Sequence, residues 1–502
     1  MVIIVNNVLE MLEKSADKNP DKILFEDENT QITYKDFVIK AKQAATAIKN
    51  EFVSGKAVPI YMDKSVDTLI WMFGTIYAGS FYTIVDIAHP LTRIESILAT
   101  LDVNKMLTSQ VYVAKLEKAG YTGDYILSED IATEEIDEEF INSIRTRHNA
   151  LSPLYCNFTS GSTGIPKGVV VGHASVIDFI TYFTELFNIT ENDIIGNQAP
   201  FDFDVSVKDI YTALKTGATL VIIPKELFIN PAKLIDCLID NKVTSLTWAV
   251  SALCFITTFH GFDYKVPTCV KRVLFSGEVM PSKHLSLWME SLPDAMFVNL
   301  YGPTEITCNC TYHILDKNKI YDKIPIGVPF NNEEVFLIDE NNKKIDQDNQ
   351  KGEICIRGTA LALGYYNNLE QTNKVFCQNP LHNKYLDMIY KTGDIGYYEK
   401  GNLYFAGRKD FQIKHLGHRI ELEEIDKRIG AIDGIKRVVT IYLKEKSKLC
   451  AFYIGDIDSK EIKQILKSEL PVYMIPGKLI KLENLPLSKN GKIDRKKLEE
   501  YI

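Results

Sequence analysis

The chain has 502 residues, of which 46% are hydrophobic and 25% are charged, and at about 150 residues per domain this length suggests roughly three structural units. The composition is typical of a globular protein and excludes disordered and fibrous classes. With 57 Lys and Arg against 66 Asp and Glu, the formal net charge is −9, which argues against nonspecific nucleic-acid binding because basic charge supplies most of that affinity. The charge is uneven, since residues 411–502 carry a net +5 and residues 1–410 a net −14.

Neither the N-terminus nor the cysteines indicate export. The apolar start lacks a basic region and a small-residue cleavage site, so we expect no signal peptide. The nine cysteines are scattered without metal-ligand spacing, which favours reduced thiols in a cytoplasmic protein. Residues 68–85 are uncharged and just reach membrane-spanning length, but Gly79-Ser80 divides them. We therefore predict a buried helix followed by a buried strand, with no membrane insertion.

Short apolar runs alternate with segments of helical spacing along most of the chain. Buried strands are predicted at residues 57–61, 81–85, 219–223 and 243–248, and a helix at 232–241. This alternation favours layered α/β structure with mostly parallel sheets. Beyond Gly407-Arg-Lys-Asp410, where the charge balance changes sign, we predict a helix at 421–429, strands at 438–443 and 449–454, and a helix at 460–469. The chain is thus expected to have a body at residues 1–409 and a small mobile α+β lobe at 410–502.

The strongest local signal is Thr159-Ser-Gly-Ser-Thr-Gly-Ile-Pro-Lys-Gly168. Glycines let backbone N–H groups turn inward, hydroxyls add donors and the lysine neutralises charge, so the segment suits a polyphosphate. It departs from the Walker pattern and precedes a strand-like run, which disfavours a P-loop kinase or GTPase. A flexible Ser/Gly surface loop would explain the glycines but not the Pro-Lys-Gly ending.

This loop resembles the signature loop of the adenylate-forming superfamily, which includes acyl-CoA synthetases, luciferases and adenylation domains of non-ribosomal peptide synthetases. Further matching motifs follow in order, and Asp86-Ile-Ala-His-Pro90 fits as well, so the resemblance covers essentially the whole chain. These motifs are Asn299-Leu-Tyr-Gly-Pro-Thr-Glu305, Gly352-Glu-Ile-Cys-Ile-Arg-Gly358, Tyr390-Lys-Thr-Gly-Asp394, Gly407-Arg-Lys-Asp-Phe-Gln-Ile-Lys414 and Asn490-Gly-Lys-Ile-Asp-Arg495. The resemblance implies a large body of α/β sheets with a β-barrel-like part.

The resemblance also implies a reaction in which a carboxylate attacks the α-phosphorus of ATP to give an acyl-adenylate and pyrophosphate. It implies that Tyr301 packs on adenine, Thr304 bonds the α-phosphate, Glu305 holds Mg²⁺ and Asp394 binds the ribose beside Arg408. Lys492 would be the catalytic lysine, delivered by the lobe, which would then turn about Asp410 so that a thiol can reach the adenylate. The turn at 412–417 would line the thiol tunnel. The full implied set is Lys492, Thr304 and Glu305 for catalysis; Thr159, Ser160, Gly161, Ser162, Thr163, Gly164, Lys167, Tyr301, Asp394 and Arg408 for ATP; and Asp410, Lys414 and Gly417 for hinge and tunnel.

Asp204 indicates which carboxylic acid is activated. In amino-acid-activating members of the superfamily an acidic residue in this region pairs the substrate α-ammonium, whereas acyl-CoA synthetases generally lack it. An ammonium partner is also a sound physical expectation for a buried aspartate. The alternative role is that of a helix N-cap.

The resemblance maps a substrate pocket whose bulky members favour a small amino acid and whose polar members favour a polar one. Part of the set resembles serine-selective pockets, whereas the chain length and residues 275–279 and 407–414 resemble ligases that load D-alanine onto a carrier protein. Lys208 leaves an acidic amino acid open, or else is an exposed helix lysine. The mapped residues are Asp204, Val205, Lys208, Trp248, Leu274, Ser276, Leu300, Cys308 and Asn309.

We therefore predict an AMP-forming ligase that adenylates an alanine- or serine-like amino acid and transfers it to the phosphopantetheine thiol of a separate carrier protein. ATP and Mg²⁺ are the expected cofactors, and a monomer is expected. The basic lobe would favour encounter with an acidic carrier. The rivals are a D-alanine–carrier protein ligase, an acyl- or aryl-CoA ligase, and an inactive nucleotide-binding scaffold.

Overall fold

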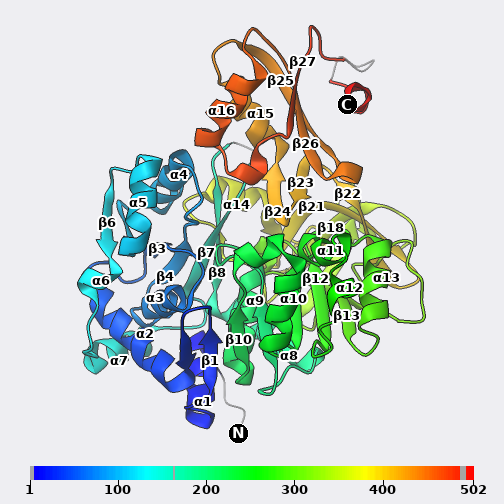
Figure 1. Ribbon diagram of the computed structural model, residues 1–502. Helices are drawn as coiled ribbons and strands as arrows, with labels where there is room; N and C mark the ends of the chain where they lie inside the picture. The colour runs from blue at the N-terminus through cyan, green and yellow to red at the C-terminus, as the bar shows by residue number, and fades with distance from the viewer. Residues whose placement is uncertain (1–4, 162–163, 487–492) are drawn as a thin grey trace.

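The computed structural model describes residues 5–161, 164–486 and 493–502 (Figure 1). Two large sheets, each flanked by helices, form most of the body. Among the described residues the larger sheet has nine strands, parallel at its centre and antiparallel at both edges. Its order is β15 (Val328–Pro329), β14 (Thr311–Ile314), β13 (Met296–Tyr301), β12 (Arg272–Ser276), β11 (Ser245–Ala249), β9 (Ile194–Asn197), β10 (Thr219–Ile222), β1 (Ile23–Glu26) and β2 (Gln31–Thr33).

The second large sheet has seven strands in the described part of the chain and is also mostly parallel. Its order is β19 (Gly364–Tyr365), β8 (Lys167–Gly172), β7 (Pro153–Thr159), β4 (Phe81–Ile84), β3 (Ala57–Tyr61), β5 (Lys105–Thr108) and β6 (Asp124–Leu127). The largest core cluster joins the two sheets, and the hydroxyls of Tyr82 and Tyr211 meet at 3.1 Å within it.

Helices cover these sheets, and several of them begin at a side chain that caps their first turn. Asn7, Thr33, Ser65 and Asn230 each accept a backbone N–H of the helix that follows. The helices of the body are α1 (Val8–Lys18), α2 (Tyr34–Ile48), α3 (Val66–Tyr77), α4 (Leu91–Leu101), α5 (Gln110–Ala119), α6 (Ser128–Ile131), α7 (Glu138–Arg147), α8 (His173–Leu186), α9 (Val205–Thr216), α10 (Pro231–Asp240), α11 (Val250–Thr258), α12 (Gly261–Tyr264), α13 (Ser282–Ser291) and α14 (Leu369–Val375).

The prediction that the uncharged segment 68–85 forms a buried helix followed by a buried strand is confirmed. α3 is almost wholly buried, Gly79 turns the chain at a φ of +77°, and the fully buried β4 follows. None of the helices among residues 5–161, 164–486 and 493–502 has the length and apolarity needed to cross a membrane.

A third, antiparallel sheet curls into a half-barrel beside the two layers. It consists of β17 (Lys344–Ile345), β16 (Glu333–Ile338), β18 (Gly352–Gly358), β21 (Met388–Glu399), β20 (Phe376–Gln378) and β22 (Asn402–Arg408). This confirms the barrel-like part that the resemblance implied.

The C-terminal α+β region sits on top of the body and has its own core, which includes Ile425, Leu449 and Leu466 (Figure 1). It contains the hairpin β23 (Gln412–His415) and β24 (His418–Glu421), the sheet β25 (Ile435–Leu443), β26 (Lys448–Gly455) and β27 (Lys478–Lys481), and the helices α15 (Leu422–Gly430), α16 (Ser459–Glu469) and α17 (Arg495–Leu498). The first predicted helix starts one residue late, because Glu421 pairs with Gln412 as the last residue of β24.

Candidate active site

A cavity of about 1740 Å³ lies between the body and the C-terminal region. The ends of β7, β12 and β13 contribute to its walls, as do β21, β22 and the β23–β24 hairpin. Roughly 300–1,000 Å³ is typical of a site for one small molecule, so this cavity has room for more than one reactant.

The glycine-rich loop connects β7 to β8, with Thr159 paired opposite Lys167. A strand follows it, as predicted, which separates it from Walker-type loops that lead into a helix. A Cβ at Gly161 would lie 2.0 Å from the Ile165 carbonyl oxygen, so that position requires glycine. Gly164 has a φ of +78°. Ser162 and Thr163 lie outside the described residues.

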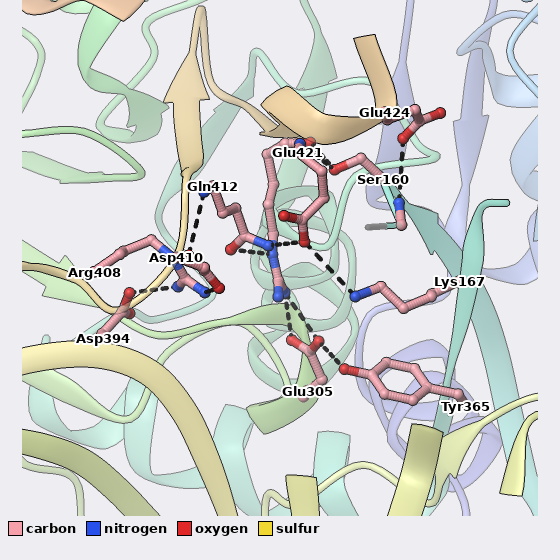
Figure 2. Close-up of polar contacts among 12 residues, drawn as sticks. Ser160, Lys167, Glu305, Tyr365, Asp394, Arg408, Asp410, Gln412, Glu421 and Glu424 are labelled. Carbon is pink, nitrogen blue, oxygen red and sulfur yellow. Dashed lines mark hydrogen bonds and ion pairs between the residues drawn. The ribbon is translucent and has the colours of Figure 1, made fainter. Parts of the chain in front are cut away.

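The residues predicted to bind the nucleoside lie together on the cavity wall. The Tyr301 hydroxyl donates to Asp394 Oδ2 at 2.5 Å. Arg408 donates to Asp394 and also binds both oxygens of Asp410, at 2.6 and 2.8 Å (Figure 2). Thr304 lines the same cavity at the start of a short 3₁₀ turn. The structure therefore joins the predicted ribose-binding pair to the predicted hinge residue.

Glu305 is completely buried and its carboxylate is fully engaged. Arg419 Nη1 lies 2.9 Å from Oε1 and 2.7 Å from Oε2, and the Tyr365 hydroxyl donates to Oε1 at 2.6 Å (Figure 2). Burial alone would raise the pKa of Glu305, but Arg419, Tyr365 and nearby Lys167 outweigh it and hold that pKa at about 2.

Lys167 extends from β8 toward the same cluster. Its Nζ lies 3.8 Å from Glu421 Oε1 and 5.5 Å from the centre of the Tyr365 ring. Burial lowers the pKa of Lys167, and the neighbouring Arg419 lowers it further.

Five of the nine predicted substrate residues line the cavity, namely Asp204, Val205, Ser276, Leu300 and Cys308. Asp204 directly precedes α9, but its side chain makes no capping hydrogen bond. Within the described residues, no hydrogen bond or ion pair uses its carboxylate. The N-cap alternative thus lacks its defining contact.

The other four predicted substrate residues, Lys208, Trp248, Leu274 and Asn309, are buried outside the cavity lining. Lys208 is not an exposed helix lysine, because it is 1% exposed and its Nζ donates to Asn309 Oδ1 at 2.7 Å. Burial lowers the pKa of Lys208. Trp248 donates from Nε1 to the Gly196 carbonyl at 2.8 Å.

The wall between Glu305 and Asn309 is formed by an unusual turn. Thr307 and Cys308 both have positive φ, +50° and +78°, which is uncommon for residues with a side chain. The Cys308 Sγ donates to the Asp204 carbonyl at 2.8 Å. The turn thereby connects two predicted pocket residues that are 104 positions apart.

The β23–β24 hairpin inserts the predicted tunnel residues into the cavity. Lys414 lies inside it, and enclosure by protein lowers the Lys414 pKa, although Asp394 and Asp204 oppose that effect. Leu416 and Gly417 form the turn with φ of +52° and +83°, the pattern of a two-residue type I′ hairpin loop. The Gly417 N–H donates to Glu278 Oε1 at 3.1 Å. Lys492 lies outside the described residues.

Sequence reasoning missed the side chains of Arg419, Glu421, Glu424 and Tyr365, all of which face the predicted phosphate site. The charged run that begins at Arg419 and ends at Glu424 was the available signal, but Glu305 and Gly161, which Arg419 and Glu424 contact, lie more than 100 positions away. All nine cysteines are free thiols. Among the described residues, no three His, Cys, Asp or Glu side chains gather in metal-binding geometry.

Known proteins resemble the chain over most of its length. The profile of the family described as "AMP-binding enzyme" matches residues 12–366. The D-alanine–D-alanyl carrier protein ligase of Bacillus anthracis is 33% identical over 98% of both chains. Gramicidin S synthase 1 of Brevibacillus brevis is 32% identical over 98% of this chain. The chain spans only 8% to 45% of the peptide synthases that it matches.

The fold is also that of solved adenylation domains. The Vibrio cholerae adenylation domain AlmE, solved with glycyl-adenosine-5′-phosphate, superposes with a TM-score of 0.87, covering 100% of this chain and 98% of that one. At 20% identity this likeness shows the fold alone. The family match over residues 12–366 and the full-length relative at 33% identity show that the chain belongs to the AMP-binding enzymes, related to the adenylation domains of peptide synthetases and to D-alanine–carrier protein ligases.

Proposed function

We propose that the chain adenylates a small or polar amino acid with ATP and then transfers it to the phosphopantetheine thiol of a carrier protein. The observation that carries this proposal is the free carboxylate of Asp204 on the wall of the large cavity. A carboxylate facing a confined space favours a cationic partner, because an unpaired charge there is costly. The α-ammonium of an amino acid supplies that partner, whereas a fatty or aryl acid does not.

The nucleotide would lie along the opposite wall. Asp394 accepts hydrogen bonds from Tyr301 and Arg408, and its acceptor chemistry suits ribose hydroxyls. Lys167 and the backbone N–H groups of the loop around Gly161 and Gly164 suit phosphate oxygens. Thr304 lines the same cavity, where its hydroxyl would serve the α-phosphate. Lys492 remains the proposed catalytic lysine.

The magnesium ion that the family implies meets a different environment at Glu305. Mg²⁺ needs carboxylate, phosphate or water oxygens arranged around it. Both oxygens of Glu305 are occupied by Arg419 and Tyr365. This arrangement therefore has no place for a metal ion at Glu305.

The second half-reaction would use the lobe, residues 410–502, turning about Asp410. Lys414 and Gly417 of the β23–β24 hairpin line the cavity, which supports a role for them along the path of an incoming thiol. Transfer to an external thiol is supported by the similarity to the D-alanine–D-alanyl carrier protein ligase, because the match covers 98% of this chain and 98% of that relative. That relative also favours D-alanine as one candidate substrate.

The direct test of the amino-acid claim is Asp204→Asn. Loss of a charge-assisted hydrogen bond costs about 1.5–3 kcal/mol, so kcat/KM for the amino acid in ATP–pyrophosphate exchange should fall about 10- to 100-fold. Asp322→Asn is the matched control, since Asp322 is exposed at the rim of the same cavity. Equal activity of Asp204→Asn and the control, or CoA thioester formation from a simple carboxylic acid, would favour an acyl-CoA ligase instead.

A further inference from the structure

Three alternate residues of β7 carry buried polar groups that are left unpaired. Tyr155 Oη, Asn157 Oδ1 and Thr159 Oγ1 have no hydrogen-bond partner within the residues that the structure describes. Buried polar groups are nearly always paired in folded proteins, so three exceptions on one strand need an explanation. Side chains two positions apart on a strand point to the same side, so the three groups form a stripe along one face of β7. The strand itself lies between β4 and β8 (Figure 1).

This stripe belongs to the face of β7 that is turned toward the proposed substrate site. Asn157 and Thr159 both line the large cavity, although Asn157 is only 4% exposed. Burial raises the pKa of Tyr155 well above its usual range, and nearby Cys308 and Asp204 raise that pKa further. Tyr155 is therefore close to two residues of the substrate wall. The stripe begins beside Asp204 and ends at the glycine-rich loop.

Asn157 occupies the middle of this stripe. At about 3.3 Å per residue, it stands roughly 6.6 Å along the strand from both Tyr155 and Thr159. In the proposed function, Asp204 holds the α-ammonium of the substrate and the glycine-rich loop holds the phosphates of ATP. The atoms that lie between these two anchors are the carboxyl carbon, the α-carbon and the first atoms of the side chain. The Asn157 amide is thus placed beside the start of the substrate side chain.

The chemistry of an amide decides which side chain suits this position. An amide offers a carbonyl acceptor and an N–H donor, and a hydroxyl can pair with either of them. A methyl group can pair with neither and would leave the amide buried and unpaired in the complex. A site that hydrogen-bonds a substrate hydroxyl rejects the analogue without it far more strongly than an apolar pocket rejects a missing methylene.

We propose that Asn157 binds a hydroxyl on the β-carbon of the amino acid and thereby selects a serine-like substrate over alanine. The inference rests on the proposed function and narrows its substrate class from a small or polar amino acid to one that carries a hydroxyl. The substrate hydroxyl supplies the partner that the Asn157 amide does not find among the described residues.

The first test compares serine with alanine of the same chirality in ATP–pyrophosphate exchange. We expect kcat/KM of the unaltered protein to be at least about tenfold higher for serine than for alanine. Asn157→Leu keeps a similar side-chain volume without polar atoms, so the ratio of the two values should fall to about one. Asn373→Leu makes the same change on an exposed position of α14 and should keep the ratio of the unaltered protein. Equal ratios in the unaltered protein and in Asn157→Leu would overturn the proposal.

Thermal unfolding of Asn157→Leu distinguishes a substrate contact from a structural role. An unpaired amide gives the folded protein no hydrogen bond to lose, so the Tm of Asn157→Leu should equal or exceed that of the unaltered protein. A lower Tm, together with an equal loss of exchange for serine and alanine, would assign Asn157 to the fold and overturn the proposal.

A second measurement uses the unaltered protein and does not depend on the folding of variants. Calorimetry with the nonhydrolysable 5′-O-sulfamoyladenosine esters of serine and alanine compares the two aminoacyl groups on the same nucleotide. The Kd of the serine compound should be at least about tenfold lower. Equal Kd values would contradict the proposal. A defect of Asn157→Leu confined to thioester formation would place Asn157 on the path of the thiol and would also contradict it.

The same exchange assay separates this inference from the proposed function. Exchange that depends on an amino acid but is as strong with alanine as with serine overturns the hydroxyl contact and leaves the proposed function intact. Exchange that no amino acid supports overturns both.

Discussion

The turn of the β23–β24 hairpin offers a way to separate the two proposed half-reactions. Gly417 has a φ of +83°, and a Cβ there would lie 3.5 Å from Ala249 Cβ, at ordinary contact distance. The larger atoms of Gly417→Leu would therefore have to enter the cavity or displace the body. The left-handed backbone adds roughly 1–2 kcal/mol of strain for a residue with a side chain.

Gly401→Leu is the control that separates the effect of backbone strain from the effect of placing a side chain at residue 417. Gly401 has a similar φ of +78° in the β21–β22 turn, but a Cβ added there would meet nothing within 4 Å. Both variants carry the backbone penalty, and only Gly417→Leu alters the proposed path of the thiol.

The assay follows both half-reactions in one preparation, as pyrophosphate exchange and as thioester formation on a carrier protein. A strain of about 1–2 kcal/mol corresponds to about 5- to 30-fold in population, so we expect thioester formation by Gly417→Leu to fall at least about tenfold. Exchange should stay within about threefold of the unaltered protein in both variants. Equal loss of exchange and thioester formation in Gly417→Leu, with Gly401→Leu unaffected, would refute the tunnel role.

Three further predictions concern charged groups. Lys492→Ala should reduce the rate of pyrophosphate exchange about 10²- to 10³-fold, as for other single groups that stabilise charge in a transition state. Lys496 is exposed, so Lys496→Ala should leave the rate unchanged. Full activity of Lys492→Ala would exclude Lys492 from the mechanism. Tyr365→Phe removes a donor that keeps the Glu305 pKa near 2, below its unfolded value, so the stabilisation is present above about pH 4.5 and is lost as pH falls toward 2. In urea unfolding, the free energy of unfolding of Tyr365→Phe should be about 1.5–3 kcal/mol lower than that of Tyr366→Phe at pH 7, and the difference should be smaller at pH 3. A difference that does not change with pH would contradict the assignment. If the basic lobe steers an acidic carrier, raising NaCl from about 0.05 M to about 0.5 M should lower kcat/KM for the carrier at least about fivefold. The KM for the amino acid should stay unchanged. A kcat/KM for the carrier that does not respond to salt would exclude electrostatic docking.

The fold was largely predictable because its strands are short, buried and rich in β-branched residues. β3 matches the predicted residues 57–61; β4 and β10 each end one residue earlier than predicted, and α10 is shifted by one residue at both ends. Local propensity and burial act together in these elements. β11 starts at Ser245, two residues after its predicted start, because Thr244 joins Asp193 and Arg272 in a polar network at the end of the strand.

The candidate site was predictable only where a residue type implies its own chemistry. Asp394, Arg408 and Tyr301 lie together as the motifs suggested. The partners of Glu305 were not predictable, because Arg419 is 114 positions away and reaches it only through the docking of the lobe. The burial of Lys208 was equally hidden, since its spacing on α9 fits an exposed lysine as well as a buried one.

Activation of an amino acid is the step on which the whole proposed function depends. The most direct measurement is ATP–pyrophosphate exchange by the unaltered protein across L- and D-amino acids and β-alanine. We expect exchange that depends strictly on an added amino acid and is strongest for a small or polar one such as alanine or serine. Exchange that proceeds equally well with the matching carboxylic acids that lack the amino group would contradict it.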